Sequence, residues 1–378
     1  MAKLGDICEI VSGSTPKTNT KDFWNGDLCW ITPAEITDND VIIFDTERKI
    51  TESGAKSCAL TLMPIGTVLL SSRAPIGKVA ITGTEMYCNQ GFKNLICSEK
   101  IHNKYLFWFL KKNTKYLNSL GRGATFKEIS KTIVANIEIP LPSLETQRKI
   151  ADNLDKVSHT IDLCSAILEK LDLLVKSRFV EMFGNININD KKWEVKPLGE
   201  LCTIVRGGSP RPIEKFLGGK IPWIKIGDAT DEDNIYLRST KEHIIQEGVK
   251  KSRLVKKGSL IFANCGVSLG FARIITFDGC IHDGWLAMED IDSRLNKIFL
   301  LQALNQMTKH FREMAPAGTQ PNLNTNIMKG YNQIIPPMEM QKQFISFVEQ
   351  VDKSKAVVKR VKAKAETLKK KLMQDYFG

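Results

Sequence analysis

Four short polar loops occur at matching places in the two halves of the chain, and their side chains can hydrogen-bond to nucleic acid. The matched pairs are residues 12–17 with 206–211, 71–77 with 263–270, 88–92 with 281–285, and 121–127 with 316–321. Glycines let a backbone come close to a ligand, while Ser, Thr, Asn, Gln and Arg supply donors and acceptors for phosphates and base edges. Any one of these loops could be an ordinary turn. Four that recur with altered polar side chains favour two binding surfaces for different DNA sequences.

The candidate DNA-contacting side chains are polar and basic residues in and beside these loops. In the first half they are Ser14, Thr15, Lys17, Ser72, Arg73, Asn89, Gln90, Arg122, Thr125 and Lys127. In the second half they are Arg206, Ser209, Arg211, Asn264, Ser268, His282, Asp283, Thr319, Gln320 and Asn322. The arginines of both sets are the strongest candidates for guanine or phosphate contact, because Arg most often contacts guanine through two hydrogen bonds. The simpler alternative for each arginine is a surface salt bridge.

These loops belong to a tandem repeat of the whole chain. Residues 3–11 read Lys-Leu-Gly-Asp-Ile-Cys-Glu-Ile-Val, and residues 197–205 read Pro-Leu-Gly-Glu-Leu-Cys-Thr-Ile-Val. Gln147 and Gln341 are separated by the same 194 positions as Leu4 and Leu198. A period of this length indicates a domain with its connector rather than a solenoid unit. A chain that resembles a symmetric dimer suits a target with twofold character, of which duplex DNA is the commonest.

The larger part of each repeat is predicted to be a mixed α and β domain. Residues 1–142 and 185–337 contain short β-type runs separated by Gly, Pro, Asn and Asp, a pattern typical of strands joined by turns. Helices are expected over Asn103–Leu117 and Asn296–Glu313. The expected fold class is α+β, with two similar mixed α/β domains in a pseudo-twofold tandem repeat.

Each repeat ends in a stretch that predicts one long helix, because residues 144–183 and 338–377 contain neither Gly nor Pro. In the first stretch, apolar residues recur at spacings of four and three: Ile150, Leu154, Val157, Ile161, Cys164, Leu168, Leu171 and Val175. The second has a weaker stripe: Phe347, Val351, Val358, Val361, Ala365, Leu368 and Leu372. Such a heptad seam is the signature of a helix that packs along another helix. We expect the two to pair as antiparallel coiled-coil helices that join and space the domains; two independent surface helices are the alternative.

Composition indicates a globular protein of the reducing cytoplasm. The chain is 42% hydrophobic and 25% charged, and its net charge of +12 is a modest argument for a polyanionic partner such as nucleic acid. Nine cysteines occur without a Cys-x-x-Cys pair, so neither a disulfide framework nor a structural zinc site is expected. Asp6 and Glu9 interrupt any signal-peptide core at the N-terminus.

Familiar catalytic motifs are missing from the sequence. It contains no Gly-x-x-x-x-Gly-Lys-Ser/Thr phosphate loop, no Asn-Pro-Pro-Tyr or Asp-Pro-Pro-Tyr tetrapeptide, and no Gly-x-Gly-x-x-Gly after a strand. No acidic pair has the spacing expected of a nuclease or a glycosidase. We therefore expect a non-catalytic chain that has no cofactor of its own and binds no metal.

With the repeat, the helices and the loops taken together, the chain resembles the specificity (S) subunit of type I restriction–modification systems over essentially its whole length. The most specific element is the repeated junction, Ile-Pro-Leu-Pro-Ser-Leu-Glu-Thr-Gln at 139–147 and Ile-Pro-Pro-Met-Glu-Met-Gln at 335–341. Each junction is followed by the long helix and Phe-Gly. One departure from the resemblance is Gln320 in the second half, where the first half has Phe126.

This resemblance implies a division of the chain and a set of partners. Residues 1–142 and 185–337 would be target-recognition domains, and residues 143–184 and 338–378 would be the spacer helices. Each domain would bind half of a bipartite double-stranded DNA site, asymmetric because the polar loops differ. Two modification (M) subunits carrying S-adenosylmethionine would methylate adenine at N6. Restriction (R) subunits using ATP and Mg²⁺ would complete an endonuclease.

Two other classes of function remain open on the sequence alone. The first is a nuclease or another DNA-processing enzyme with an unfamiliar active site, for which Asp228, Asp231 and Asp283 are the candidate carboxylates. The second is a scaffold whose repeat serves only protein docking. Catalysis by the purified chain would favour the first, and neutral substitutions throughout the loops would favour the second.

Overall fold

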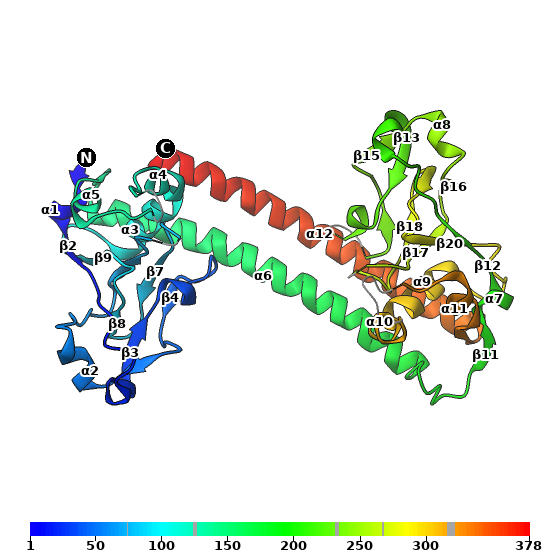
Figure 1. Ribbon diagram of the computed structural model, residues 1–378, viewed down its shortest axis with the longest axis horizontal. Coiled ribbons are helices and arrows are strands. Elements are labelled where there is room, and N and C mark those ends of the chain that lie inside the picture. The colour runs from blue at the N-terminus through cyan, green and yellow to red at the C-terminus, as the bar shows by residue number, and fades with distance from the viewer. Residues whose placement is uncertain (74, 124–126, 231–233, 267, 316–321) are drawn as a thin grey trace. The chain divides into compact units, whose positions relative to one another are not determined.

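The chain divides into two compact units that repeat one architecture (Figure 1). The computed structural model describes all residues except 74, 124–126, 231–233, 267 and 316–321. Unit 1 comprises Met1–Ala166 with Lys359–Gly378, and unit 2 comprises Ile167–Val358. The long helices α6 (Leu144–Phe183) and α12 (Met338–Phe377) are therefore both divided: each contributes one part to unit 1 and the other part to unit 2.

Unit 1 is built on a five-stranded sheet, a three-stranded sheet and a two-stranded ribbon. Its strands are β1 (Ala2–Lys3), β2 (Cys8–Val11), β3 (Trp24–Ile31), β4 (Ile42–Ile43), β5 (Lys49–Ile50), β6 (Val68–Leu70), β7 (Val79–Thr82), β8 (Tyr87–Cys88), β9 (Asn94–Cys97) and β10 (Glu138–Ile139). The sheet orders are β2-β9-β6-β7-β4, β5-β3-β8 and β1-β10. Its short helices are α1 (Leu4–Ile7), α2 (Glu52–Ser57), α3 (Asn103–Lys112), α4 (Thr114–Ser119) and α5 (Lys131–Ala135), with 3₁₀ turns η1 (Lys21–Phe23) and η2 (Pro33–Glu35).

Unit 2 repeats this plan with one added strand. Its strands are β11 (Glu194–Pro197), β12 (Thr203–Arg206), β13 (Leu217–Ile224), β14 (Tyr236–Leu237), β15 (Glu242–Ile244), β16 (Arg253–Val255), β17 (Leu260–Ala263), β18 (Ala272–Ile275), β19 (Gly279–Ile281), β20 (Trp285–Glu289) and β21 (Asn332–Ile335). The orders are β12-β20-β17-β18-β14, β15-β13-β19-β16 and β11-β21. Strand β16 is extra; at the equivalent place unit 1 has one isolated bridge, Met63 with Met86.

The short helices of unit 2 also match those of unit 1 in order. They are α7 (Leu198–Leu201), α8 (Gln246–Val249), α9 (Lys297–Gln306), α10 (Thr308–Met314) and α11 (Thr325–Gly330), with 3₁₀ turns η3 (Ile213–Lys215) and η4 (Ile226–Ala229). The predicted fold class, two similar mixed α/β domains in tandem, is confirmed.

The central strands form continuous apolar runs because both faces of the five-stranded sheet are covered. In β6, Val68 and Leu70 lie in the cluster that contains α3, whereas Leu69 lies in the opposite cluster with Met86 and Phe92. Successive side chains of a strand point to opposite faces, so a strand buried on both faces needs apolar residues at every position. The cluster that contains Leu69, Met86 and Phe92 packs under the ends of these strands and supports the loops that follow them.

Each of the two predicted mid-chain helices is broken into a pair of helices. In unit 1 the break is at Asn113, between α3 and α4, where the Asn113 side chain donates to the Phe109 carbonyl at 2.9 Å. In unit 2 the break is at Met307, between α9 and α10. Asn113 illustrates the physical reason in unit 1: its amide binds a backbone carbonyl of the preceding turn and so competes with continuation of the helix.

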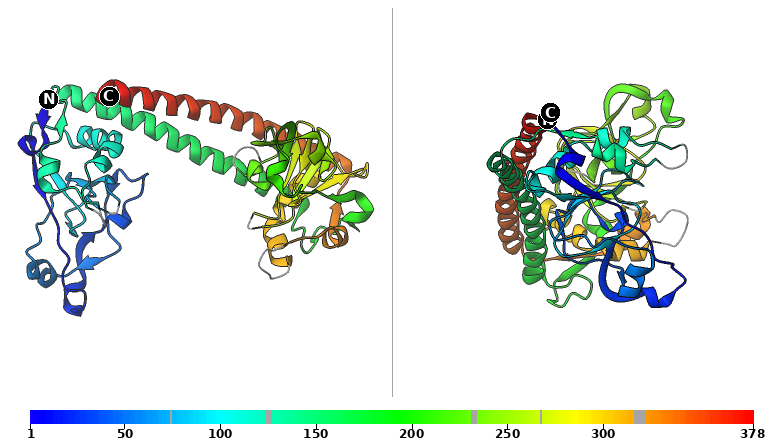
Figure 2. Two further views of the ribbon diagram at one scale, coloured as in Figure 1. Left: turned by 45° about the horizontal axis from the view of Figure 1, so that its top comes forward. Right: turned by 90° about the vertical axis from the view of Figure 1, so that its left-hand side faces the viewer.

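The long helices pair within each unit, as Figure 2 also shows. In unit 2, Asp172 of α6 contacts Lys355 of α12, and seven residues further along α6 Phe179 contacts Phe344. The later residue of α6 contacts the earlier residue of α12, so the two helices are antiparallel in unit 2. In unit 1, Asn153 of α6 donates to the hydroxyl of Tyr376 near the end of α12 at 3.3 Å.

The seam predicted on α6 is present, but the seam predicted on α12 is partly wrong. All eight α6 positions are buried or half-buried, whereas Val361 and Leu368 of α12 are exposed. The α12 residues that alternate at spacings of four and three and are buried or half-buried are Phe344, Val348, Val351, Lys355, Val358, Lys362, Ala365, Lys369 and Leu372. Lysines occupy three of these positions, because a lysine can bury its methylene stem while its ammonium group finds a polar partner or an aromatic ring.

Two buried glutamines fasten the long helices to their units in the same way. The Gln147 side chain accepts from the His102 backbone at 2.8 Å and donates to the carbonyls of Lys100 and Pro142. Gln341 accepts from the Asn296 backbone at 2.8 Å and donates to the carbonyls of Arg294 and Pro336. A fully satisfied buried amide fixes one geometry, which explains why the repeated junction carries glutamine at both places.

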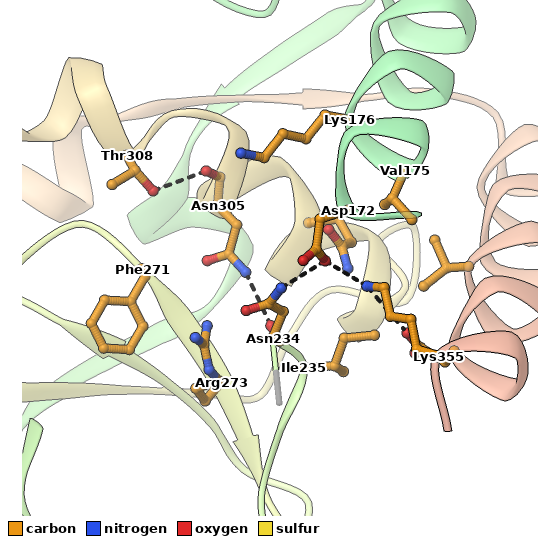
Figure 3. A pocket seen from close by; sticks show the side chains of 13 residues that line it. Asp172, Val175, Lys176, Asn234, Ile235, Phe271, Arg273, Asn305, Thr308 and Lys355 are labelled. Carbon is orange, nitrogen blue, oxygen red and sulfur yellow. Dashed lines mark hydrogen bonds and ion pairs between the residues drawn. The ribbon is translucent and has the colours of Figure 1, made fainter. Parts of the chain in front are cut away.

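A charged cavity in unit 2 lies where α6 and α12 meet the globular part (Figure 3). Asp172 accepts hydrogen bonds from Lys355 at 2.6 Å and from Asn234 at 2.8 Å, so one carboxylate ties both helices to a loop before β14. The cavity measures about 240 Å³.

No helix within the described residues combines the length and the apolar character needed to cross a membrane.

Candidate nucleic-acid interface

In unit 1 the predicted loops are joined to one another by backbone hydrogen bonds. Ser14 of the first loop donates to the Cys88 carbonyl of the third loop at 3.1 Å. Ser72 of the second loop donates to the Gly91 carbonyl of the third at 2.7 Å, and accepts at its own carbonyl from Ile129 at 3.0 Å. Ile129 directly follows the fourth loop and Glu128. The loops therefore form one surface. We call the backbone hydrogen bonds that join them the loop frame.

Unit 2 has the same frame, bond for bond. Gly208 donates to the Ile281 carbonyl at 3.0 Å, as Ser14 does to Cys88. Asn264 donates to the Gly284 carbonyl at 2.9 Å, and its carbonyl accepts from Leu323 at 2.8 Å. Residues 316–321, which make up the fourth loop of unit 2, lie outside the described residues; just after them, Asn322 forms a bridge with Cys265. Because the frames coincide, side chains at equivalent positions can be compared directly.

A glycine brings the first loop against the third loop in each unit. A Cβ added to Gly13 would lie 1.9 Å from the Cys88 carbonyl oxygen. A Cβ added to Gly207 would lie 2.2 Å from the His282 carbonyl oxygen and 2.6 Å from that of Ile281. Only glycine allows this approach, since the obstacles are backbone atoms that cannot rotate away.

One pair of side chains spans the same two loops in both units but differs in character. In unit 1 the Thr15 hydroxyl donates to the side-chain oxygen of Gln90. In unit 2 the Ser209 hydroxyl donates to the Asp283 carboxylate at 2.6 Å. A neutral amide in one unit thus stands where the other has a carboxylate, on a shared frame.

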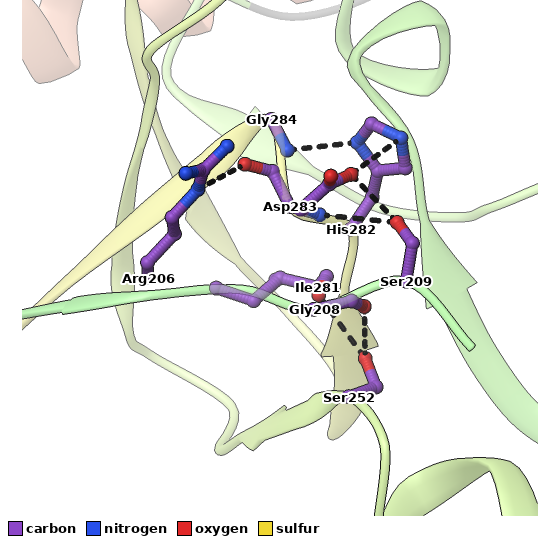
Figure 4. A network of polar contacts seen from close by, with 8 residues as sticks. All are labelled: Arg206, Gly208, Ser209, Ser252, Ile281, His282, Asp283 and Gly284. Atoms are coloured by element: carbon purple, nitrogen blue, oxygen red, sulfur yellow. Dashed lines mark hydrogen bonds and ion pairs between the residues drawn. The ribbon is translucent and has the colours of Figure 1, made fainter. Parts of the chain in front are cut away.

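The loops of unit 2 carry a polar network centred on Asp283 (Figure 4). Arg206 donates through Nε to the Asp283 carbonyl at 2.9 Å. The Gly284 N–H donates to Nδ1 of His282 at 2.9 Å, so Nδ1 is the unprotonated nitrogen, and Nε2 lies 3.0 Å from Oδ1 of Asp283. Beneath them, the Ser252 hydroxyl donates to the carbonyls of Gly208 and Ile281 at 2.8 and 3.1 Å.

Charge states in this network follow from burial and neighbours. Burial lowers the pKa of His282; the Asp283 carboxylate opposes this, but burial together with Lys225, Arg211 and Arg206 keeps the pKa below its usual value, which favours the neutral imidazole at neutral pH. Burial alone would raise the pKa of Asp283, but the Ser209 hydrogen bond and the neighbouring His282, Arg206 and Arg211 outweigh it and hold that pKa below its usual value. Asp283 is therefore a carboxylate.

In unit 1 a buried lysine supports the basic loops. Lys93 is 8% exposed, forms an ion pair with Glu128 at 3.1 Å, and lies 3.4 Å from the Ser72 hydroxyl. The backbone of Glu128 bridges to both Arg73 and Arg122. Among the described residues neither arginine side chain has an ion-pair partner, so both guanidinium groups are available for a ligand.

The predicted contact residues fall into three groups in the structure. Those at least partly exposed are Ser14, Thr15, Lys17, Arg73, Asn89, Gln90, Arg122, Lys127, Arg206, Ser209, Arg211, Ser268, His282, Asp283 and Asn322. Ser72 and Asn264 have no exposed surface, because they hold the second loop to the third and fourth loops. We therefore omit these two from the proposed contacts. Thr125, Thr319 and Gln320 lie outside the described residues, as does Phe126.

Sequence reasoning missed the residues that support this surface. Lys93, Glu128 and Ser252 lie outside the polar loops, and they act on those loops through ion pairs and hydrogen bonds from below. The pairing of Thr15 with Gln90 joins residues far apart in the sequence. The repeat is the one sequence signal that could have indicated such pairs, because equivalent positions in the two halves occupy equivalent places in the loop frame.

The carboxylates considered for catalysis have other partners. Asp228 accepts from the backbone of Lys225 at 2.8 Å and from the Thr240 hydroxyl at 2.8 Å, so it caps the turn η4. Asp231 lies outside the described residues. Within the described part of the chain, no group of three or more His, Cys, Asp or Glu side chains is placed to hold a metal ion.

Comparison with known proteins places the repeat in a family. The family model for the type I restriction modification DNA specificity domain matches residues 1–173 and 190–367. The chain is 34% identical over 374 residues to the MjaIX type I restriction enzyme specificity subunit of Methanocaldococcus jannaschii, across 92% of this chain and 85% of that protein. It is 21% identical to the MjaVIII specificity subunit of the same organism, across 99% of this chain and 90% of that protein.

Solved structures share the fold. The S subunit of a type I restriction–modification system from M. genitalium is 16% identical and aligns with a TM-score of 0.60, covering all of this chain and 95% of that one. A chain from a structural study of type I restriction–modification complex assembly and conformational transition is 19% identical, with a TM-score of 0.65 over all of this chain and 96% of that one. With the family model matched in both repeats and a relative of this identity along most of its length, the chain belongs to the type I restriction modification DNA specificity domain family.

Proposed function

We propose that this chain is the sequence-specific DNA-binding specificity subunit of a type I restriction–modification complex and performs no chemistry itself. The observation that carries the proposal is the shared loop frame with different polar side chains in the two units. The two units share the backbone arrangement of their loops but present different side chains, which fits a DNA site made of two different halves. Residues 1–142 and 185–337 are the proposed recognition domains, and residues 143–184 and 338–378 are the proposed spacer helices.

The chemistry in this proposal belongs to partner subunits acting in the cytoplasm. Two modification subunits use S-adenosylmethionine to methylate adenine at N6. Restriction subunits use ATP and Mg²⁺ to cleave unmodified DNA. The family membership supports this assignment, and the paired helices offer a surface for partner docking. The specificity subunit then contributes the choice of sequence alone.

A selection from random DNA duplexes tests the proposal with the purified full-length chain. We expect enrichment of one split motif whose two defined halves differ in sequence and are separated by a spacer of fixed length. Enrichment of no motif, or of one uninterrupted motif, would refute the split-site proposal. Cleavage or methylation of DNA by the chain alone would instead support the enzyme alternative.

Within this proposal, Arg206 is expected to contact a base and Lys17 a phosphate. Arg206 is held through Nε by the Asp283 carbonyl, and neither Nη group has a hydrogen-bond partner among the described residues, so both can meet a guanine edge. We expect Arg206→Ala to cost about 1–3 kcal/mol of binding free energy and to relax one position of the motif. Lys17→Ala should weaken binding to all sequences alike and reduce the salt slope by about 1. Motif selection and binding across a salt series measure both, and identical behaviour of the two variants would contradict the assignment.

A further inference from the structure

Asp283 has one carboxylate oxygen, Oδ1, bound by the protein and one, Oδ2, without a hydrogen bond to a described residue. Oδ1 accepts from the Ser209 hydroxyl at 2.6 Å and lies 3.0 Å from Nε2 of His282. Oδ2 makes no hydrogen bond to any residue that the structure describes, and the side chain is 33% exposed. The Ser209 hydrogen bond and the adjacent His282 ring restrict the rotamer, which limits the directions in which Oδ2 can accept a hydrogen bond (Figure 4).

An ionised carboxylate only accepts hydrogen bonds, and this limits what Oδ2 can meet in a DNA groove. Phosphates are excluded because both groups are negative. Guanine and thymine offer acceptors at their major-groove edges, whereas cytosine N4 and adenine N6 offer donors. Adenine places the N7 acceptor next to its amino group, so a carboxylate there would meet repulsion as well as attraction. Cytosine has no acceptor beside N4 on its own edge, so only guanine O6 across the pair is near, and cytosine is the base that best matches a single acceptor.

The equivalent residue of unit 1 provides an internal comparison. Gln90 is anchored by Thr15 as Asp283 is anchored by Ser209, on the same backbone frame. Its side chain is neutral, and anchoring through its oxygen leaves an amide N–H₂ donor. The two units therefore present opposite hydrogen-bonding characters at one position of the frame.

Resting on the DNA-binding function proposed above, we propose that Asp283 is a specificity-determining residue that selects cytosine at one position of the half-site bound by unit 2. Ser209 and His282 act as positioning residues for its carboxylate. DNA that carries guanine or thymine at this position should bind more weakly, because the acceptors of these bases would face Oδ2 in a partly dehydrated interface.

The test compares three full-length chains in the random-duplex selection: the unaltered protein, Asp283→Asn and Asp290→Asn. In Asp283→Asn the oxygen can keep the Ser209 hydrogen bond while the new N–H₂ replaces Oδ2, so an acceptor becomes a donor. We expect this variant to lose cytosine at one position by roughly 5- to 150-fold in relative affinity and to accept bases that present an acceptor there. Every other position of the motif should be unchanged.

Asp290→Asn is the matched control. It removes the same charge from unit 2, but Asp290 follows the far end of β20, where it accepts from Thr203 rather than facing the loops. Asn also tolerates the positive φ of 49° at this position. This control should select the unaltered motif, because charge alone does not set the preference.

The outcomes separate this inference from the function on which it rests. If the unaltered chain selects no split motif, the proposed function itself fails. If it selects a split motif that Asp283→Asn leaves unchanged, or changes in both halves, the role of Asp283 is refuted while the function stands. Should Asp283→Asn bind no DNA, Ser209→Ala decides: it keeps the carboxylate, and it must weaken the cytosine preference at one position only, or the inference is wrong.

Discussion

Gly207→Ala is expected to abolish recognition of one half of the DNA site and to leave the other half intact. The added methyl carbon would lie 2.2 Å from the His282 carbonyl oxygen, so the first loop must move away from the third. That movement separates Ser209 from Asp283 and displaces Arg206. Loss of one of two halves should remove about half of the ~4–10 kcal/mol that usually separates specific from non-specific binding, or about 2–5 kcal/mol.

The same substitution in unit 1, Gly13→Ala, should affect the other half of the motif, since the Cys88 carbonyl is as close there. Gly227→Ala is the matched control, because a Cβ at Gly227 meets nothing within 4 Å. Motif selection with each full-length variant measures the effect. Loss of both halves in either loop variant, or an equal loss in the Gly227 variant, would contradict independent recognition by the two units.

Phe179→Ala is expected to cause the largest loss of stability, about 3–5 kcal/mol of unfolding free energy. Phe179 of α6 is fully buried and contacts Phe183, Phe299 and Phe344 at ring-centroid distances of 5.0, 5.8 and 5.4 Å. This cluster joins α6, α9 and α12 within unit 2. Truncation would leave a cavity enclosed by aromatic rings that cannot collapse to fill it.

The neighbouring Val180 provides the control for this prediction, because its side chain is 52% exposed. Val180→Ala should stay within about 0.5 kcal/mol of the unaltered protein. Chemical-denaturant unfolding measures both variants. Similar losses for the two would mean that α6 is not held in unit 2 by this cluster.

The repeat and the apolar periodicity made the architecture predictable from the sequence. The long helices are found where the stretches without Gly and Pro lie, and the strands follow the β-type runs. Periodicity failed where lysines take seam positions. Lys355 pairs with Asp172, and Lys369 places its ammonium group 4.9 Å from the ring of Trp108. A pattern of apolar residues cannot show these positions, because their burial depends on partners far away in the sequence.

The recognition surface was only partly predictable. Polar residues of a loop look alike in a sequence whether they face solvent or hold the loop together. Ser72 and Asn264 hold the second loop to its neighbours, whereas Arg73 beside Ser72 leaves its guanidinium group without an ion-pair partner among the described residues. The distinction depends on which backbone groups of other loops lie within hydrogen-bonding reach. That information enters only with the fold.

Methylome sequencing of cells with and without the gene for this chain tests the central claim most directly. We expect one split N6-methyladenine motif, with two different halves, to be present in the parent, absent in the deletion and restored when the gene is returned. A methylome that is identical with and without the gene would contradict the account, as would the loss of an uninterrupted palindromic motif.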